Sequence, residues 1–180
     1  MIYVKSVTAL LNENKIRTNL KKLGINKFKF SDCYRKRDNS KCSCRSWNIE
    51  KDDLLIGFYE PFFIDTPYTR LKNVFFYLRY GYLEIADHYG DGDILGICLR
   101  HDTERYKQVL VFPGKCASEG ENIFGILQHE LLHIRYKEHC LDKKCLFNFD
   151  AGNNKNLCKH CRVNLKEIIK GLNNSEVKNG

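Results

Sequence analysis

The chain has 180 residues and a mass of 21.1 kDa, which is enough for one domain with its own core and too little for two large ones. Hydrophobic residues make up 43% and charged residues 29% of the sequence, which excludes a disordered or fibrous protein. The formal net charge of +8 is spread without a long basic run, so charge alone leaves a nucleic-acid partner open without making it the expected one.

Alternating and helical spacings divide the first half of the chain into short elements. Gly24 directly follows a helical spacing and is of the residue type that commonly ends helices. The expected elements are a strand near 2–4, a helix over 7–23, a strand at 27–30, a loop at 31–47 and two apolar runs at 54–64 and 74–85, the second with the length of a buried helix.

The second half of the chain has clearer signals. Ser118 and Glu121 have the spacing of a capping box that would begin a helix. Pro113-Gly114 is expected to close the strand before it. The expected elements are strands at 94–99 and 108–112, a helix over 123–136, a helix around 165–172 and a frayed polar tail at 173–180.

The helix over 123–136 contains His129-Glu130-Leu131-Leu132-His133, an H-E-x-x-H pattern. Two imidazoles four positions apart share one helix face and can bind one Zn²⁺ ion. Glu130 would lie beside the position of a zinc-bound water, whose pKa the metal lowers to near neutrality. We therefore predict a hydrolytic site with His129 and His133 as metal ligands and Glu130 as the general base.

His139 is the predicted third ligand. On a continued helix it would lie about 240° around the axis from His133, so it can join the metal only if the helix ends and the chain turns back. The apolar period is lost after Tyr136, which favours such a stop. The alternative third ligands are Glu138, Asp142 and Glu167.

The nine cysteines favour metal binding. The sequence begins without a signal-peptide pattern and has no apolar run near the ~20 residues that cross a bilayer, so we expect a cytoplasmic protein, in which disulfides are disfavoured. Two close pairs, Cys140 with Cys145 and Cys158 with Cys161, have the usual composition of a closed structural zinc site. The other five are expected as free thiols: Cys33, Cys42 and Cys44 in a loop, Cys98 in the core and Cys116 in a loop. The alternative for the first three is a third metal site completed by a histidine, although their spacing is not a standard one.

With these residues the sequence resembles the archaemetzincins, a family of zinc metalloproteases in the metzincin clan. The family pattern is H-E-x-x-H-x-x-G-x-x-H-C-x4-C-x-M with a downstream C-x-x-C, and the matching stretches here are HELLHIRYKEHCLDKKCLF and CKHC, within 128–161. The resemblance implies a catalytic zinc on His129, His133 and His139, with Glu130 as the base. It also implies a second, structural zinc on Cys140, Cys145, Cys158 and Cys161. In such proteases an edge strand pairs with extended substrate, and Val109–Phe112 is the candidate.

Two residues depart from the family pattern. Tyr136 replaces the glycine that lets the chain swing the third histidine inward, and a left-handed conformation there would cost roughly 1–2 kcal/mol unless the turn falls at Lys137 or Glu138. Phe147 replaces the methionine beneath the metal, so an aromatic floor is expected to support the histidines. The gap between the cysteine pairs is also shorter than in typical members, which predicts a trimmed lobe.

Together these observations predict an α/β fold of metzincin type, a twisted mixed sheet backed by helices. Residues 1–139 would form the subdomain with the active-site helix, and residues 140–180 a small lobe with the four-cysteine zinc site, within one compact domain. The predicted activity is zinc-dependent hydrolysis of a peptide or protein substrate by a monomer without membrane association. The alternatives are a DNA-associated protease of the Wss type and a zinc-binding protein that has lost catalysis.

Overall fold

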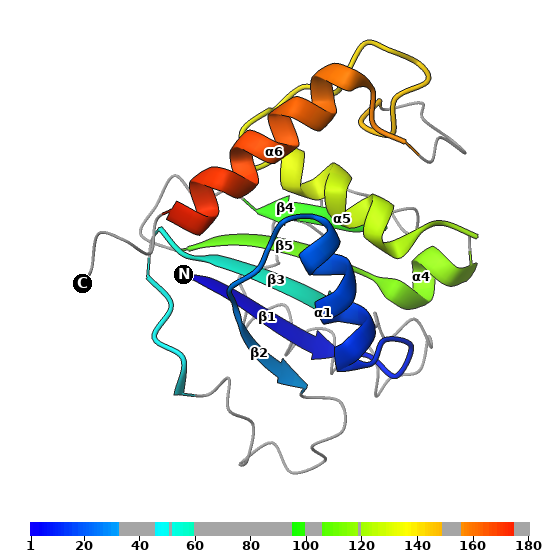
Figure 1. Cartoon of the computed structure of the whole chain (residues 1–180). Coiled ribbons are helices and arrows are strands. Elements are labelled where there is room, and N and C mark those ends of the chain that lie inside the picture. The colour runs from blue at the N-terminus through cyan, green and yellow to red at the C-terminus, as the bar shows by residue number, and fades with distance from the viewer. Residues whose placement is uncertain are drawn as a thin grey trace.

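The computed structural model describes residues 1–32, 46–50, 52–59, 95–99, 106–118, 120–148 and 156–174. They contain a five-stranded sheet of order β2-β1-β3-β5-β4. The strands are β1 (Ile2–Val7), β2 (Lys29–Asp32), β3 (Leu54–Tyr59), β4 (Gly96–Leu99) and β5 (Lys107–Val111). Four of them run parallel, and β4 pairs antiparallel with β5 at one edge (Figure 1). The sheet is therefore mixed, and the expected α/β class is confirmed.

The central strands are those whose sequences are apolar almost throughout. Every residue of β3 is buried, which is typical of a parallel strand with both faces covered. The register places Ile56 of β3 beside Val4 of β1 and Val109 of β5, so that one apolar row crosses the sheet. Short runs of β-branched and aliphatic residues thus position the strands that carry the rest of the fold.

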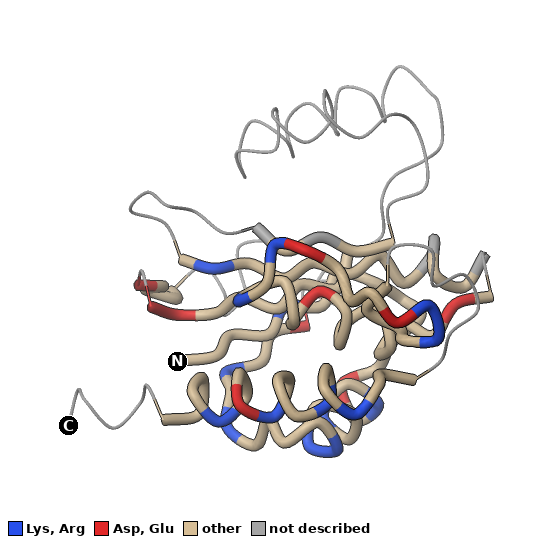
Figure 2. The backbone as a smooth tube through the Cα atoms, turned by 90° about the horizontal axis from the view of Figure 1, so that it is seen from above, with Lys and Arg blue, Asp and Glu red and all other residues tan. Residues whose placement is uncertain are grey.

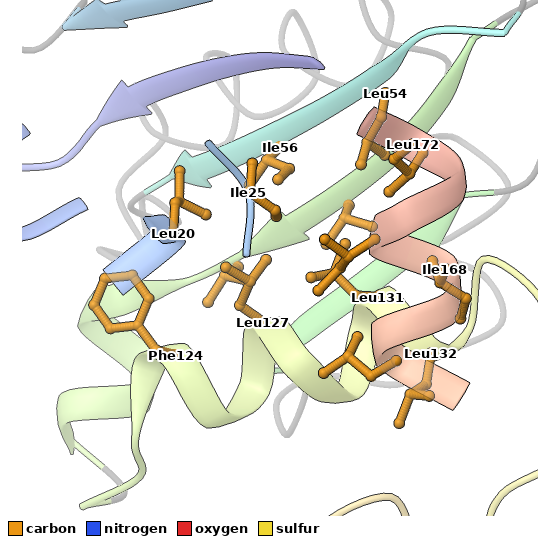
Figure 3. Close-up of a cluster of buried hydrophobic side chains, with 14 of the residues drawn as sticks. Leu20, Ile25, Leu54, Ile56, Phe124, Leu127, Leu131, Leu132, Ile168 and Leu172 are labelled. Carbon is orange, nitrogen blue, oxygen red and sulfur yellow. The ribbon is translucent and has the colours of Figure 1, made fainter. Parts of the chain in front are cut away.

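The three longer helices lie over one face of this sheet (Figure 1). They are α1 (Glu13–Lys22), α5 (Ile123–Leu132) and α6 (Lys159–Asn174), with the short helix α4 (Pro113–Ser118) preceding α5. Leu20 of α1, Leu127 of α5 and Leu172 of α6 point toward the same core over the sheet (Figure 3). The core continues into the cysteine-rich segment through Cys145, Leu146, Phe147, Leu157 and Cys161. The segments on either side of residue 140 therefore share one hydrophobic core.

Both ends of α1 are capped by its own sequence. The Asn12 side chain accepts a hydrogen bond of 2.8 Å from the Lys15 amide. At the other end Gly24 has a φ of 91°, and the Ile25 amide donates to the Leu20 carbonyl at 2.9 Å, a Schellman motif. Gly24 therefore ends the helix as predicted, but the helix begins later than residue 7, which lies in β1.

The predicted capping box of the histidine-bearing helix is wrong. The N-cap of α5 is Asn122, whose side chain accepts from the Phe124 amide at 3.1 Å, because residues 113–118 already form α4. Pro113 comes directly after the end of β5, as predicted, and it also begins α4, since its missing N–H costs nothing in the first helical turn. The end of α5 at Leu132 also comes earlier than the predicted end near Tyr136.

Cys116 lies in α4 and is fully buried, so its expected place in a loop is wrong. Its thiol is 3.6 Å from the Leu95 carbonyl, to which it can donate. Burial raises the pKa of this thiol to about 11. Cys98 is half-buried on β4.

Several expectations concern residues outside the described ranges. These are the apolar run at 74–85, most of the loop at 31–47 and the thiols Cys33, Cys42 and Cys44. No helix in the described part of the chain is long and apolar enough to cross a membrane.

Candidate metal centres

Three imidazole rings converge where α5 ends. The Nε2 atom of His129 lies 3.2 Å from Nε2 of His139 and 3.3 Å from Nε2 of His133. His129 and His133 share one helix face, as their spacing predicted, and His139 arrives from the chain after the helix. The three residues form one group able to hold a metal ion, with their candidate ligand atoms within 4.8 Å of one another.

Main-chain carbonyls hold the other ring nitrogen of two of these histidines. Nδ1 of His129 lies 2.9 Å from the Leu146 carbonyl, and Nδ1 of His133 lies 3.1 Å from the Tyr136 carbonyl. A carbonyl oxygen only accepts hydrogen bonds, so each Nδ1 carries the proton and each Nε2 keeps its lone pair. Two lone pairs that face each other at 3.3 Å repel, and a shared cation removes that repulsion. The donor set therefore fits a metal ion bound through Nε2.

The pKa values of two of the imidazoles also favour metal binding. Burial lowers the pKa of His129, although the Leu146 carbonyl opposes the shift, and burial also lowers the pKa of His139. A lowered pKa keeps the imidazole neutral at physiological pH. The neutral ring is the form that binds a metal.

His139 reaches the cluster because the helix stops at Leu132. The amides of Arg135 and Tyr136 both donate to the Leu132 carbonyl, at 3.1 and 3.0 Å, which closes the last turn and redirects the chain. In the part of the chain that the structure describes, no residue other than glycine has a positive φ. Tyr136 therefore replaces the family's glycine without left-handed strain, and the cost of roughly 1–2 kcal/mol does not arise.

The carboxylates considered as alternative third ligands lie elsewhere. Asp142 accepts from the Lys144 amide at 2.9 Å, and Glu167 pairs with Arg135 at 3.2 Å. Glu138 is exposed. No carboxylate of the described residues joins the histidine group. Three protein ligands without a fourth are the composition of a metal site that keeps a position open.

Phe147 forms the floor of the histidine cluster. Its ring centroid lies 5.1 Å from that of His129, 4.8 Å from that of His133 and 5.4 Å from that of His139. The side chain is only 3% exposed. An aromatic residue at the position of the family's methionine thus packs against all three imidazoles, as predicted.

Glu130 is buried against the edge strand β4. Its carboxyl accepts a hydrogen bond from the Cys98 amide, and a Cβ on Gly96 would lie 2.8 Å from Glu130 Cγ. The Phe112 amide donates to the Leu95 carbonyl at 2.9 Å, so the main-chain groups of Cys98 face away from β5 in this register. Glycine at 96 leaves room for the carboxyl beside the strand. Sequence reasoning missed this role of Gly96, because only the packing of α5 on β4 reveals it.

Burial raises the pKa of Glu130 to about 8, against the lowering effect of the Cys98 amide. The residue is 8% exposed. A carboxyl group with a pKa near neutrality can both take up and release a proton near neutral pH, which is the requirement for a general base that also acts as an acid.

The strand predicted to pair with substrate is not at the edge of the sheet. β5, which contains most of Val109–Phe112, lies between β3 and β4. Its main-chain groups are therefore used by neighbours on both sides, and among the described strands β4 is at the edge, beside Glu130. The prediction was wrong because a sequence shows that a strand exists but not which neighbours it has.

Four cysteines form a second group. The sulfur atoms of Cys140, Cys145, Cys158 and Cys161 lie within 4.8 Å of one another, and all four are free thiols. The amides of Phe147 and Cys158 donate to Cys145 Sγ at 3.4 and 3.3 Å, and the Cys161 amide donates to Cys158 Sγ at 3.5 Å. Such donors stabilise thiolates that bind a metal.

The pKa values of the cysteine thiols show how burial and hydrogen bonds act on their ionisation. Burial raises the pKa of Cys145 and of Cys161. Burial also opposes ionisation of Cys158, but hydrogen bonds from the Cys161 amide and from the other thiols outweigh it and lower the pKa of Cys158. Four thiolates at this spacing need a cation, and four sulfur ligands fit a closed tetrahedral Zn²⁺ site.

The segment 145–147 belongs to both groups. Cys145 is a candidate ligand of the second site, the Leu146 carbonyl orients His129, and the Phe147 ring supports the histidines. The Cys140 amide donates to the Phe147 carbonyl at 2.8 Å, which ties this segment to the residue after His139. The two candidate metal centres therefore share one structural segment. Every residue has a main-chain carbonyl, so the sequence could not predict that the Leu146 carbonyl orients His129.

Comparisons of the chain with protein-family models, with curated proteins and with solved structures found no match. The likeness to archaemetzincins is thus a likeness of the motif residues.

Proposed function

We propose that this protein is a zinc-dependent peptide hydrolase of the archaemetzincin type. The observation that carries the proposal is the convergence of His139 Nε2 on the paired imidazoles of α5, with two of the three rings fixed by main-chain carbonyls. The pattern H-E-x-x-H by itself occurs in helices without a metal. A third imidazole at hydrogen-bonding distance, in a group without a carboxylate ligand, favours a catalytic site.

In this proposal His129, His133 and His139 hold the zinc ion. Zinc with three such ligands lowers the pKa of water at its open position and polarises a carbonyl group. Glu130 takes the proton of the attacking water and returns it to the amine nitrogen that leaves, which its pKa of about 8 supports. Phe147 keeps the imidazoles in place during turnover by packing beneath them.

The edge strand β4 is the proposed substrate platform. An extended peptide can add to a sheet edge through main-chain hydrogen bonds, and β4 is the edge strand among the described strands. The Cys98 carbonyl faces that side, whereas the Cys98 amide is bound to Glu130. Glu130 lies against the same strand, so a peptide bound there runs past the proposed base. The substrate class that fits is an unfolded or short peptide.

Cys140, Cys145, Cys158 and Cys161 hold a structural zinc ion in this proposal. They offer a complete set of four ligands and leave no open position, so this site contributes folding energy rather than chemistry.

The test combines metal content with turnover. We expect the native protein to contain two zinc ions by elemental mass spectrometry and the His129→Ala/His133→Ala variant to contain one. Glu130→Gln keeps both ions, because Glu130 is not a ligand, yet it should lower the cleavage rate of a peptide library about 10²- to 10⁴-fold.

Two results would contradict the proposal. If Glu130→Gln cleaves the library as fast as the parent, Glu130 is not the base. If parent and double histidine variant both hold a single zinc ion, the protein is a zinc-binding module that has lost catalysis.

A further inference from the structure

A groove of about 400 Å³ lies between the end of α1 and the C-terminal half of α6. Its charged lining comes from two helices that are far apart in the sequence: Lys21 and Lys22 from α1, and Lys166 and Lys170 from α6. The Asn173 side-chain nitrogen donates to the Gly24 carbonyl at 2.9 Å and so joins the two helices at the groove. We call these four lysines and Asn173 the basic groove. It lies apart from both candidate metal centres.

The positive charge of the basic groove is not neutralised within the described part of the chain. None of its four lysines forms an ion pair with a carboxylate there. The one acidic residue of α6 is Glu167, and it is already paired with Arg135 at 3.2 Å. Four positive charges in one groove repel one another, so a bound anion would reduce this repulsion.

The positive charge continues along α6. Lys159, Arg162, Lys166 and Lys170 stand at positions i, i+3, i+7 and i+11, and all four are exposed. This spacing places them on one face over about 16 Å of helix. Figure 2 shows Lys and Arg recurring along the helix that precedes the C-terminal tail. The opposite face of α6 is buried in the core through Cys161, Leu165, Ile168, Ile169 and Leu172.

Asn173 holds the two helices together at the groove. Its side-chain nitrogen is used by Gly24, and its side-chain oxygen is buried without a hydrogen-bond partner among the described residues. Because this oxygen is not accessible from the groove, the groups that can bind a ligand there are the four lysines.

We propose that the basic groove and the charged face of α6 bind the sugar-phosphate backbone of a nucleic-acid strand. Cations repeated at regular intervals match an anion that also repeats, as phosphodiesters do, better than a single small anion. Among the described residues no aromatic side chain lines the groove, so we expect no base stacking there and binding that is independent of sequence.

The face of α6 does not fit a membrane surface as well. A helix that lies on a bilayer inserts bulky apolar residues between its basic ones. Val163 is the large hydrophobic residue exposed on α6, at 49%, and the rest of the apolar side chains are buried in the core. This inference does not depend on the proposed peptidase activity.

The test is fluorescence anisotropy of labelled single-stranded RNA and DNA of one sequence, titrated with the full chain over a range of salt concentrations. We expect binding that weakens steeply with salt. The Lys166→Glu/Lys170→Glu variant should bind at least tenfold more weakly at low salt, and its slope of log affinity against log salt should be shallower by about 1.4. The matched control is Lys143→Glu/Lys144→Glu, which makes the same charge change at two exposed residues outside the groove.

The outcomes separate the proposal from its rivals. Loss of binding in the groove variant but not in the control supports it, provided that both variants unfold at the temperature of the parent. Equal losses in both variants, or no binding by the parent at low salt, overturn the proposal. Binding to phosphatidylserine vesicles without binding to either strand also overturns it.

Discussion

At the scale of single residues, Phe147 contacts both candidate metal centres. Its ring contacts three imidazoles, its amide donates to Cys145 Sγ, and its carbonyl accepts from Cys140. A methionine floor is flexible and adapts its shape, whereas a phenyl ring is rigid and fills a larger volume. The histidine cluster of this protein is therefore supported by a rigid ring that contacts all three imidazoles.

We expect Phe147→Ala to lower the free energy of unfolding by about 3–5 kcal/mol, because it opens a cavity beneath the histidines. It should also weaken Co²⁺ binding at the histidine cluster while the thiolate absorption of Co²⁺ at the cysteine site is kept. Denaturant unfolding and absorption titrations measure the two effects. Phe147→Met is the matched control and should retain most of both properties. Unchanged Co²⁺ affinity at the histidines in Phe147→Ala would show that the ring is not a support.

The raised pKa of the Cys116 thiol predicts how the stability of the protein depends on pH. Its folded-state pKa is raised to about 11 from 9.0 by burial, so the folded protein holds this proton more tightly than the unfolded chain does. The resulting stability is fully present below about pH 9 and is lost as the pH rises towards 11, by roughly 3 kcal/mol in total. Denaturant unfolding from about pH 8 to 11 should show this decline in the parent. A Cys116→Ala variant with an equally steep decline would assign it to other groups.

At the scale of elements, the contact between α5 and β4 decides where the proposed base lies. A Cβ at Gly96 would lie 2.8 Å from both Glu130 Cγ and Ile126 Cγ2, and 3.1 Å from the Leu110 carbonyl oxygen. The helix can therefore approach the strand only over a glycine. The same strand presents the main-chain groups that we propose for substrate binding.

We expect Gly96→Ala to reduce peptide cleavage more than tenfold and to destabilise the protein by about 1–3 kcal/mol, because the added methyl displaces Glu130 or the helix. The control is Gly171→Ala, since a Cβ there meets nothing within 4 Å. In the helix α6 that substitution should stabilise the protein by about 0.5–1 kcal/mol. Thermal unfolding and cleavage assays compare the pair, and normal cleavage by Gly96→Ala would disprove the crowding argument.

Most elements, but not their junctions, were predictable from the sequence. β1, α1 and α6 follow from apolar spacing, and Gly24 ends α1 as expected. The apolar run that contains β3 was recognised, but its spacing did not show whether it forms a strand or a helix. The capping residue of α5 was misassigned because Ser118 and Glu121 have the spacing of a capping box, whereas Asn122, directly before the helix, is the N-cap. Local signals compete at such boundaries, and the packing of α4 decides between them.

At the scale of the whole molecule, one core joins the sheet, the helices and the cysteine loop. The four cysteines connect the loop after His139 to the beginning of α6, whose other end lies against Gly24. A metal ion bound by the four cysteines would therefore join this loop to α6, and α6 in turn contacts the N-terminal part of the chain. Its removal should affect the entire fold rather than a local loop.

We expect a strong chelator to lower the unfolding temperature by roughly 5–10 °C, since a metal held at about 100 times its dissociation constant contributes about 2.7 kcal/mol. The decrease should be nearly as large in the His129→Ala/His133→Ala variant, because the cysteine site supplies most of it. Scanning calorimetry with and without chelator gives both values. If the double variant shows no decrease, the stabilising metal is at the histidines instead.

The sequence by itself determined the α/β class, the metal-binding residue types and the pairing of His129 with His133, because these depend on local spacing along a helix or strand. Only the tertiary structure decided that His139 faces inward, that β4 rather than β5 is at the edge of the described strands, and that Lys21 and Lys166 line one groove. Each of these depends on where the chain turns and which neighbours its elements meet. Such long-range choices are made by packing of the common core, in which distant segments compete for the same space.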